Sequence, residues 1–211
     1  MVIRWAGCRI VRGAELPDSA EEPQIMAMAA ITPPVTTIDA LLALPEDGLR
    51  HELLDGVHAV TPAPRHGHQR LVVKLIGAFL GGLRGHRDFE VLVSPADLVL
   101  GPRTLVQPDL FLVRSDPEGP PVPWSEMGVP VLAVEVLSPG TAARDRGAKR
   151  RIYQAAGVGE YWVVDPDARL VERWTPGDDR PEILDTVIVW APDGRSLVTV
   201  ELATLFGRDE F

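Results

Sequence analysis

Two acidic residues lie where the surrounding sequence is apolar, and both are candidates for chemistry. Glu135 interrupts the apolar run 131–137, and Asp109 follows Pro108 inside the run 105–113. Burying an unpaired carboxylate costs several kcal/mol or forces the group to take up a proton. A divalent cation is one solution, because two carboxylates on neighbouring strands and a substrate phosphate suffice to hold Mg²⁺. A buried salt bridge to an arginine is an equally economical interpretation of Glu135.

Three residues after Glu135 share one face of a predicted helix. Asp145, Lys149 and Tyr153 are spaced four positions apart, so their side chains lie on roughly the same side. On spacing alone, the favoured interpretation is an Asp–Lys surface pair worth about 0.2–0.5 kcal/mol, with the tyrosine packed beside it. In the alternative interpretation, the Lys149 ammonium polarises a water or stabilises charge on a phosphate.

The same helix carries a dense basic cluster. Five of the 21 Lys and Arg residues fall within eight positions, namely Arg144, Arg146, Lys149, Arg150 and Arg151. Such a cluster indicates a phosphate-contacting surface, and a solvated helix face is the equally simple alternative. Contacts to a nucleic acid are expected from Arg144, Arg146 and Arg150.

The composition limits the classes of protein to which the chain can belong. Its 211 residues suffice for one domain with a sizeable core and are short for two. The formal net charge of −9 counts against a large nonspecific nucleic-acid surface, so the affinity of a monomer for DNA is expected to be modest. Cys8 is the only cysteine, which excludes an intrachain disulfide and is typical of a reducing cytoplasm. No apolar run approaches the roughly 18 residues of a membrane span, so no membrane association is expected.

The hydrophobic pattern predicts a mixed α/β framework for these residues. Residues 1–34 lack periodicity and are expected to form a flexible N-terminal extension, with the domain itself spanning 35–211. Asp55-Gly56, between two short mixed runs, predicts a β-hairpin. The other elements are predicted as helices over 38–44, 71–83 and 142–156, and as strands over 90–93, 97–100, 105–113, 131–137, 160–165, 170–174, 183–190 and 197–202. The last three strands are predicted to form a β-meander.

Taken together, these features resemble a known family. The pattern consists of Gln107-Pro108-Asp109, VEVLSPGT at 134–141 and EYWVVDP at 160–166, together with Asp145, Lys149, Tyr153, Gly157, the hairpin string ELLDG at 52–56 and His68. It is similar to the bacterial Uma-two family of restriction-endonuclease-like proteins, in the PD-(D/E)XK nuclease superfamily, over residues 37–206. The resemblance implies a restriction-endonuclease-like single domain, in which helices flank a central mixed β-sheet and a β-meander ends the chain.

The resemblance also implies roles for particular residues. Asp109 and Glu135 match the metal-binding acids of the superfamily, and the implied cofactor is Mg²⁺, for which Mn²⁺ can substitute. Leu137 stands where the superfamily carries its basic residue, and the family pattern moves that role to Lys149. Glu52 resembles an additional acid that helps to hold metal, and a surface charge on the hairpin is the equally weighted alternative.

Three further residues are weaker candidates for the site. His68, near a helix start, could hydrogen-bond the site or the substrate, although a structural histidine at a helix start is the more common case. Tyr153 is expected in the core more than in a cleft. Asp145 is included because it shares the helix face of Lys149.

The function that these residues imply is hydrolysis of DNA phosphodiester bonds by a Mg²⁺-dependent endonuclease. The alternative is a nuclease-fold module with weak or no catalysis that binds nucleic acid or a protein partner, because a fold does not guarantee an activity. RNA or a nucleotide is a third and weaker substrate class. A homodimer suits cleavage of both strands of a duplex, and the strands of the C-terminal meander are the edges that could pair across a two-fold axis.

Overall fold

The computed structural model of the chain describes residues 34–116, 118–119 and 127–207. The extension predicted for residues 1–34 lies, apart from Pro34, outside the described residues, so it stays a prediction. The described part confirms the predicted mixed α/β class with a mixed central sheet.

The central sheet holds six strands in the order β10-β9-β8-β7-β6-β3. Its strands are β3 (Phe89–Val93), β6 (Leu110–Arg114), β7 (Leu132–Val136), β8 (Glu160–Asp165), β9 (Leu170–Trp174) and β10 (Glu182–Leu184). β7 and β8 run parallel, whereas the other neighbours in this sheet are antiparallel. A parallel pair requires a crossover connection, and the helix predicted over 142–156 supplies it.

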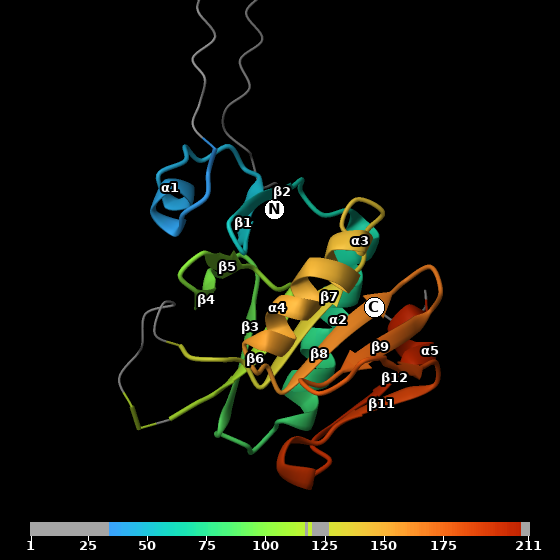
Figure 1. The fold of residues 1–211 in the computed structure, drawn as a ribbon. Coiled ribbons are helices and arrows are strands. Elements are labelled where there is room, and N and C mark those ends of the chain that lie inside the picture. Colours follow the sequence, from blue (N-terminus) through green and yellow to red (C-terminus); the bar gives the residue numbers. More distant parts are fainter. Residues whose placement is uncertain (1–33, 117, 120–126, 208–211) are drawn as a thin grey trace, which may run out of the picture. The chain divides into compact units, whose positions relative to one another are not determined.

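Helices cover both faces of this sheet (Figure 1). One face carries α2 (His66–Gly82), which is the helix predicted over 71–83 with an earlier start. The other face carries the crossover, which consists of α3 (Ala142–Arg144), the π-helical segment η2 (Asp145–Lys149) and α4 (Arg150–Ala155).

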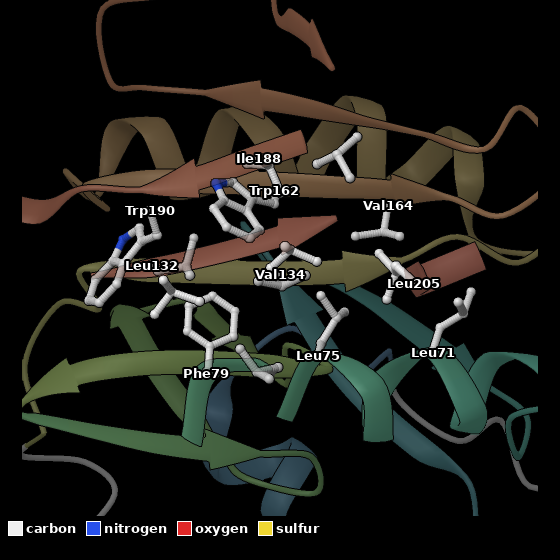
Figure 2. Close-up of a cluster of buried hydrophobic side chains, with 14 of the residues drawn as sticks. Leu71, Leu75, Phe79, Leu132, Val134, Trp162, Val164, Ile188, Trp190 and Leu205 are labelled. Atoms are coloured by element: carbon white, nitrogen blue, oxygen red, sulfur yellow. The ribbon is translucent and has the colours of Figure 1, made fainter. Parts of the chain in front are cut away.

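The core between the sheet and α2 decides which way the residues of β7 point. Leu75 and Phe79 pack with Val134 and Trp162 in one buried apolar cluster (Figure 2). Burying each such side chain stabilises the fold by about 1.5–3 kcal/mol, so this register is strongly preferred. Because successive strand residues point to opposite faces, Glu135 is directed away from this core and towards α4.

A second sheet has the order β2-β1-β5-β4. Its strands are β1 (Arg50–Leu54), β2 (Val57–Thr61), β4 (Leu98–Gly101) and β5 (Thr104–Val106). The predicted hairpin is confirmed, since Asp55 and Gly56 join β1 to β2 with φ values of 52° and 84°, the positive angles that a tight hairpin turn needs. Helix α1 (Ile38–Leu42) precedes this sheet, and the hydroxyl of Thr37 caps it by accepting a hydrogen bond from the N–H of Ala40.

The strand predicted over 105–113 is two strands that belong to different sheets. β5 ends at Val106 and β6 begins at Leu110, and Gln107-Pro108-Asp109 connects the two sheets. Pro108 has no N–H to donate to a strand ladder, which is a physical reason for pairing to stop here. Asp109 therefore lies where the chain leaves the four-stranded sheet and enters the central one.

The strands predicted as a C-terminal meander are divided between two sheets. β9 and β10 extend the central sheet, whereas β11 (Val187–Trp190) and β12 (Val198–Glu201) form a separate antiparallel pair, with the single turn η3 (Pro192–Gly194) between them. The apolar face of this pair packs into the same core cluster as α2, which is why it does not continue the sheet edge. The last predicted strand ends early, because Leu202 starts helix α5 (Leu202–Phe206). Pairing of these strands with a second copy stays a prediction.

Among the helices of the described residues, none is long and apolar enough to cross a membrane.

Candidate active site

Four buried carboxylates come together from separate elements on the α4 side of the central sheet. We call them the acid cluster: Glu52 of β1, Asp109 before β6, Glu135 of β7 and Asp145 of η2. Their charges act on one another, since Asp109 and Asp145 both raise the pKa of Glu135. The structure therefore brings together Asp109, Glu135, Glu52 and Asp145, all of which are candidate site residues from the sequence. Glu52 is fully buried, so the alternative of a surface charge on the hairpin is wrong.

Lys149 is the basic residue at the centre of the acid cluster. Its side chain is fully buried, and its Nζ lies 2.5 Å from Glu135 Oε1 and 2.7 Å from Glu52 Oε1. The interpretation favoured by spacing alone, a surface pair of Asp145 and Lys149, is wrong because both residues are buried. Burial lowers the pKa of Lys149, but the charges of Glu135 and Glu52 outweigh it and raise that pKa above its ordinary value. Lys149 is therefore an ammonium ion.

A π-helical turn sets the position of Lys149. The helix was predicted as regular over 142–156, but the N–H of Arg150 donates to the carbonyl of Asp145, five residues earlier. The turn is wider than an α-helical one, and both Asp145 and Lys149, at its two ends, are buried. Such single π turns inside α-helices are frequent at functional sites.

Asp109 is held by three hydrogen-bond donors. Arg50 Nη1 lies 2.8 Å from Oδ1, His68 Nε2 lies 2.9 Å from Oδ2, and the N–H of Val136 donates to Oδ2 at 2.9 Å. Burial acts to raise the pKa of Asp109, but the hydrogen bond and charge of His68, with the charge of Arg50, lower it to about 2. Asp109 is therefore ionised, and His68 contacts the acid cluster directly.

Arg50 is a site residue that was not predicted from the sequence, although its position on β1 gives a signal for it. Residues two apart on a strand point to the same face, and Arg50 stands two positions before Glu52 on β1. Because Glu52 is buried on that face, Arg50, the basic residue two positions earlier, is a candidate to form an ion pair with a nearby acid. The salt bridge to an arginine that was considered for Glu135 is instead made by Asp109.

Glu135 has the opposite electrostatic environment. Burial raises its pKa to about 8, Lys149 opposes this, and the nearby carboxylates add to it. The hydroxyl of Tyr153 donates to Glu135 Oε1 at 3.1 Å. Tyr153 is a buried residue, as expected, and it also fixes the orientation of the candidate ligand. Burial likewise raises the pKa of Asp145.

The oxygen atoms of the cluster are of the type that a divalent cation binds. Three permanently charged cations, Arg50, Arg144 and Lys149, lie among the four carboxyl groups, and a metal at Glu135 would replace the proton that its raised pKa of about 8 favours. Glu52 Oε2 is buried and accepts no hydrogen bond. Oxygen ligands of this kind are those that Mg²⁺ takes, and Mg²⁺ needs only one or two carboxylates besides water and phosphate. The donor set thus fits the ion. Within the described residues no group of three or more His, Cys, Asp or Glu side chains is arranged to hold a metal.

The basic residues predicted to share one nucleic-acid surface contact different partners in the structure. Arg144 reaches the hairpin, where it donates to the Thr61 hydroxyl and lies 3.8 Å from Glu52 Oε2. Arg146 and Arg150 are directed elsewhere, because neighbouring helix positions point in different directions. Arg146 forms ion pairs of 2.6 Å with Asp165 and Glu172, and the Arg150 guanidinium stacks 4.8 Å from the Trp174 ring. Of the three, only Arg144 contacts the acid cluster, and the contact of these arginines with nucleic acid stays a prediction.

Comparison with known proteins identifies the family and the fold of the chain. The model of the Uma2 family, described as "Putative restriction endonuclease", matches residues 38–203. A solved structure from Anabaena variabilis ATCC 29413, described as a "putative nuclease belonging to DUF820", matches with a TM-score of 0.70 at 20% identity, covering 81% of this chain and 97% of that chain. That likeness shows a shared fold, and among curated proteins none matches the chain. Because the family model spans most of the sequence, the chain belongs to the Uma2 family, as its motifs indicated.

Proposed function

We propose that this protein is a divalent-metal-dependent endonuclease that hydrolyses phosphodiester bonds of DNA at the acid cluster. One observation carries the proposal. Asp109, which directly precedes β6, lies near enough to Glu135 of β7 for its charge to raise the pKa of Glu135, and the fully buried ammonium of Lys149 lies 2.5 Å from Glu135. Family membership supports a nuclease activity in general. The metal and the DNA substrate are parts of the proposal.

In this proposal Asp109 and Glu135 hold Mg²⁺, with Mn²⁺ as a substitute. When bound, the ion lowers the pKa of a water and stabilises charge that develops at phosphorus. Arg50 and His68 fix the Asp109 carboxylate, and Tyr153 fixes Glu135, so both acids are oriented before substrate arrives.

Lys149 has two tasks in the proposed mechanism. It lies within hydrogen-bond distance of both Glu52 and Glu135, and its positive charge reduces the repulsion between them. As substrate enters, its ammonium orients the attacking water or stabilises charge on the phosphate. A lysine on the helix thereby replaces the basic residue that Leu137 cannot supply.

The test is nicking of supercoiled DNA with Mn²⁺ or Mg²⁺. Asp109→Ala and Glu135→Ala should abolish the activity while the far-UV circular dichroism stays that of the wild type. Glu135→Gln keeps the shape of the side chain and its contact with Tyr153, so it separates loss of the charge from loss of packing. Wild-type nicking by both alanine variants would sink the proposed site.

One observation favours a second candidate, a nucleic-acid-binding module of weak or no activity. Both proposed metal ligands already contact cations of the protein, Arg50 and Lys149, so metal must compete with them. Calorimetric titration with Mn²⁺ separates the two candidates. Binding that is lost in Glu135→Gln supports the enzyme, and no binding at millimolar metal supports the module.

A further inference from the structure

The acids and the cations of the acid cluster differ in the exposed fraction of their side chains. The acids are buried, with Glu52 0% and Asp109 4% exposed. The cations that contact these acids reach the surface, with Arg50 19%, Arg144 18% and His68 12% exposed. An anion that approaches from solvent therefore meets guanidinium groups before it meets carboxylates, although the whole chain has a net charge of −9.

Each of the two arginines has a donor that no described residue uses. Arg50 donates through Nη1 to Asp109 Oδ1 at 2.8 Å and to the carbonyl of Gln107 at 3.3 Å, while its Nε is buried without a hydrogen-bond partner. Arg144 donates through Nη2 to the Thr61 hydroxyl, and its Nε is buried and unpartnered as well. A buried donor without an acceptor costs about 1–3 kcal/mol, so two of them at one site indicate an acceptor that arrives from outside.

The hairpin brings these two arginines to the same place. Arg50 lies directly opposite Thr61 in the ladder of β1 and β2, and Thr61 is the residue to which Arg144 donates. Arg144 also lies 3.8 Å from Glu52, which shares a strand face with Arg50. Two elements far apart in sequence thus deliver two guanidinium groups to one edge of the acid cluster.

We propose that Arg50 and Arg144 form a phosphate-binding subsite, and that Arg50 anchors the phosphodiester group that is cleaved. The planar guanidinium matches phosphate oxygens with paired N–H donors, and its charge favours an anionic phosphodiester over a neutral ligand. Arg50 is tied to Asp109, so a phosphate held by Arg50 lies beside a proposed metal ligand. The inference rests on the proposed nuclease function, and contacts of this kind position a substrate without reading its sequence.

The experiment measures binding of a fluorescently labelled 20-base-pair DNA duplex in EDTA, where no metal-dependent cleavage occurs. Arg50→Gln should raise the Kd about tenfold at low salt and reduce the slope of log Kd against log salt by about one phosphate contact. Arg114→Gln is the matched control, because it removes the same charge from an exposed residue that is paired with Asp193. Equal Kd values for Arg50→Gln and Arg114→Gln would overturn the proposal.

A second pair of variants separates contact with phosphate from support of Asp109. Asp109→Asn releases Arg50 from its ion pair and should tighten DNA binding in EDTA, and adding Arg50→Gln should remove that gain. If the double variant binds as tightly as Asp109→Asn, Arg50 serves Asp109 alone and the subsite is wrong. Arg50→Lys retains the positive charge and the ion pair, so it provides the test if the Arg50→Gln variant folds poorly. It should bind more weakly than wild type because it lacks the paired donors, and wild-type affinity would overturn the anchoring role.

The two proposals fail in different ways. A wild-type protein that binds DNA through Arg50 in EDTA but cuts no DNA with Mn²⁺ refutes the endonuclease and supports the subsite. A protein that cuts DNA with Mn²⁺ while Arg50→Gln binds like the control refutes the subsite alone.

Discussion

Lys149 Nζ lies 2.5 Å from Glu135 Oε1, although the two residues are 14 positions apart and belong to a helix and a strand. The same Nζ lies 2.7 Å from Glu52 Oε1, so one ammonium joins the central sheet, the crossover helix and the hairpin of the second sheet. Both acids and the lysine are buried. This three-residue bridge is the contact on which the stability of the site depends.

Removing the bridge should destabilise the fold. Lys149→Met keeps an unbranched side chain that is one heavy atom shorter but leaves two buried acids, Glu52 and Glu135, without their cation. The free energy of unfolding at pH 7 should fall by about 3–5 kcal/mol, as measured by urea denaturation, because breaking a buried ion pair strands its partner. The double variant Lys149→Met/Glu135→Gln should recover part of the loss. If Lys149→Met unfolds at the wild-type urea concentration, the bridge is not formed in solution.

The raised pKa of Glu135 predicts a specific dependence of stability on pH. In the folded state this pKa is about 8, against an ordinary value of 4.5, so the native state binds a proton that the unfolded state has released. The stabilising contribution is complete below about pH 4.5 and is lost as the pH rises towards 8, with a slope of up to about 1.4 kcal/mol per pH unit. In EDTA, wild-type protein should therefore lose stability relative to Glu135→Gln across that range. A difference between the two proteins that does not change with pH would contradict this environment for Glu135.

His68 should matter for metal binding through Asp109. His68→Ala removes the 2.9 Å hydrogen bond to Asp109 Oδ2 and leaves the proposed ligand less well oriented. Loss of such a supporting residue typically lowers metal affinity 10–100-fold, and calorimetric Mn²⁺ titration should show a decrease in about that range. His86→Ala is the matched control, since His86 is more exposed and lies near Asp88. Equal Mn²⁺ affinities in the two variants would show that His68 has only a structural role.

Arg146 should contribute to stability and not to DNA binding. It forms ion pairs with Asp165 and Glu172 and is partly exposed, so each pair is expected to contribute about 0.2–1 kcal/mol. Arg146→Gln should lower the thermal midpoint slightly while the salt dependence of DNA binding stays that of the wild type. Arg144→Gln, on the same helix, should weaken DNA binding. A reversal of these two results would restore the surface that the sequence predicted for Arg146.

Much of the framework follows from local sequence. Asp55-Gly56 identifies the hairpin, because both residues must adopt positive φ, and Thr37 identifies a helix start through its capping hydroxyl. The apolar runs around Asp109 and Glu135 identify both acids as buried, because an apolar strand hides any charge within it. These inferences depend on residues that are adjacent along the chain, and the sequence lists those residues directly.

The sequence by itself thus determined the fold class and pointed to the candidate acids, and the family resemblance implied Lys149 in place of a basic residue at position 137. Only the tertiary structure decided that Gln107-Pro108-Asp109 links two sheets, that a π turn buries Lys149, and that Arg50 binds Asp109. It also decided that, of the three arginines predicted to contact nucleic acid, only Arg144 contacts the acid cluster. The physical reason is that each of these features depends on contacts between elements that are distant in sequence. The partners of Asp109, for example, come from positions 59 and 41 residues away.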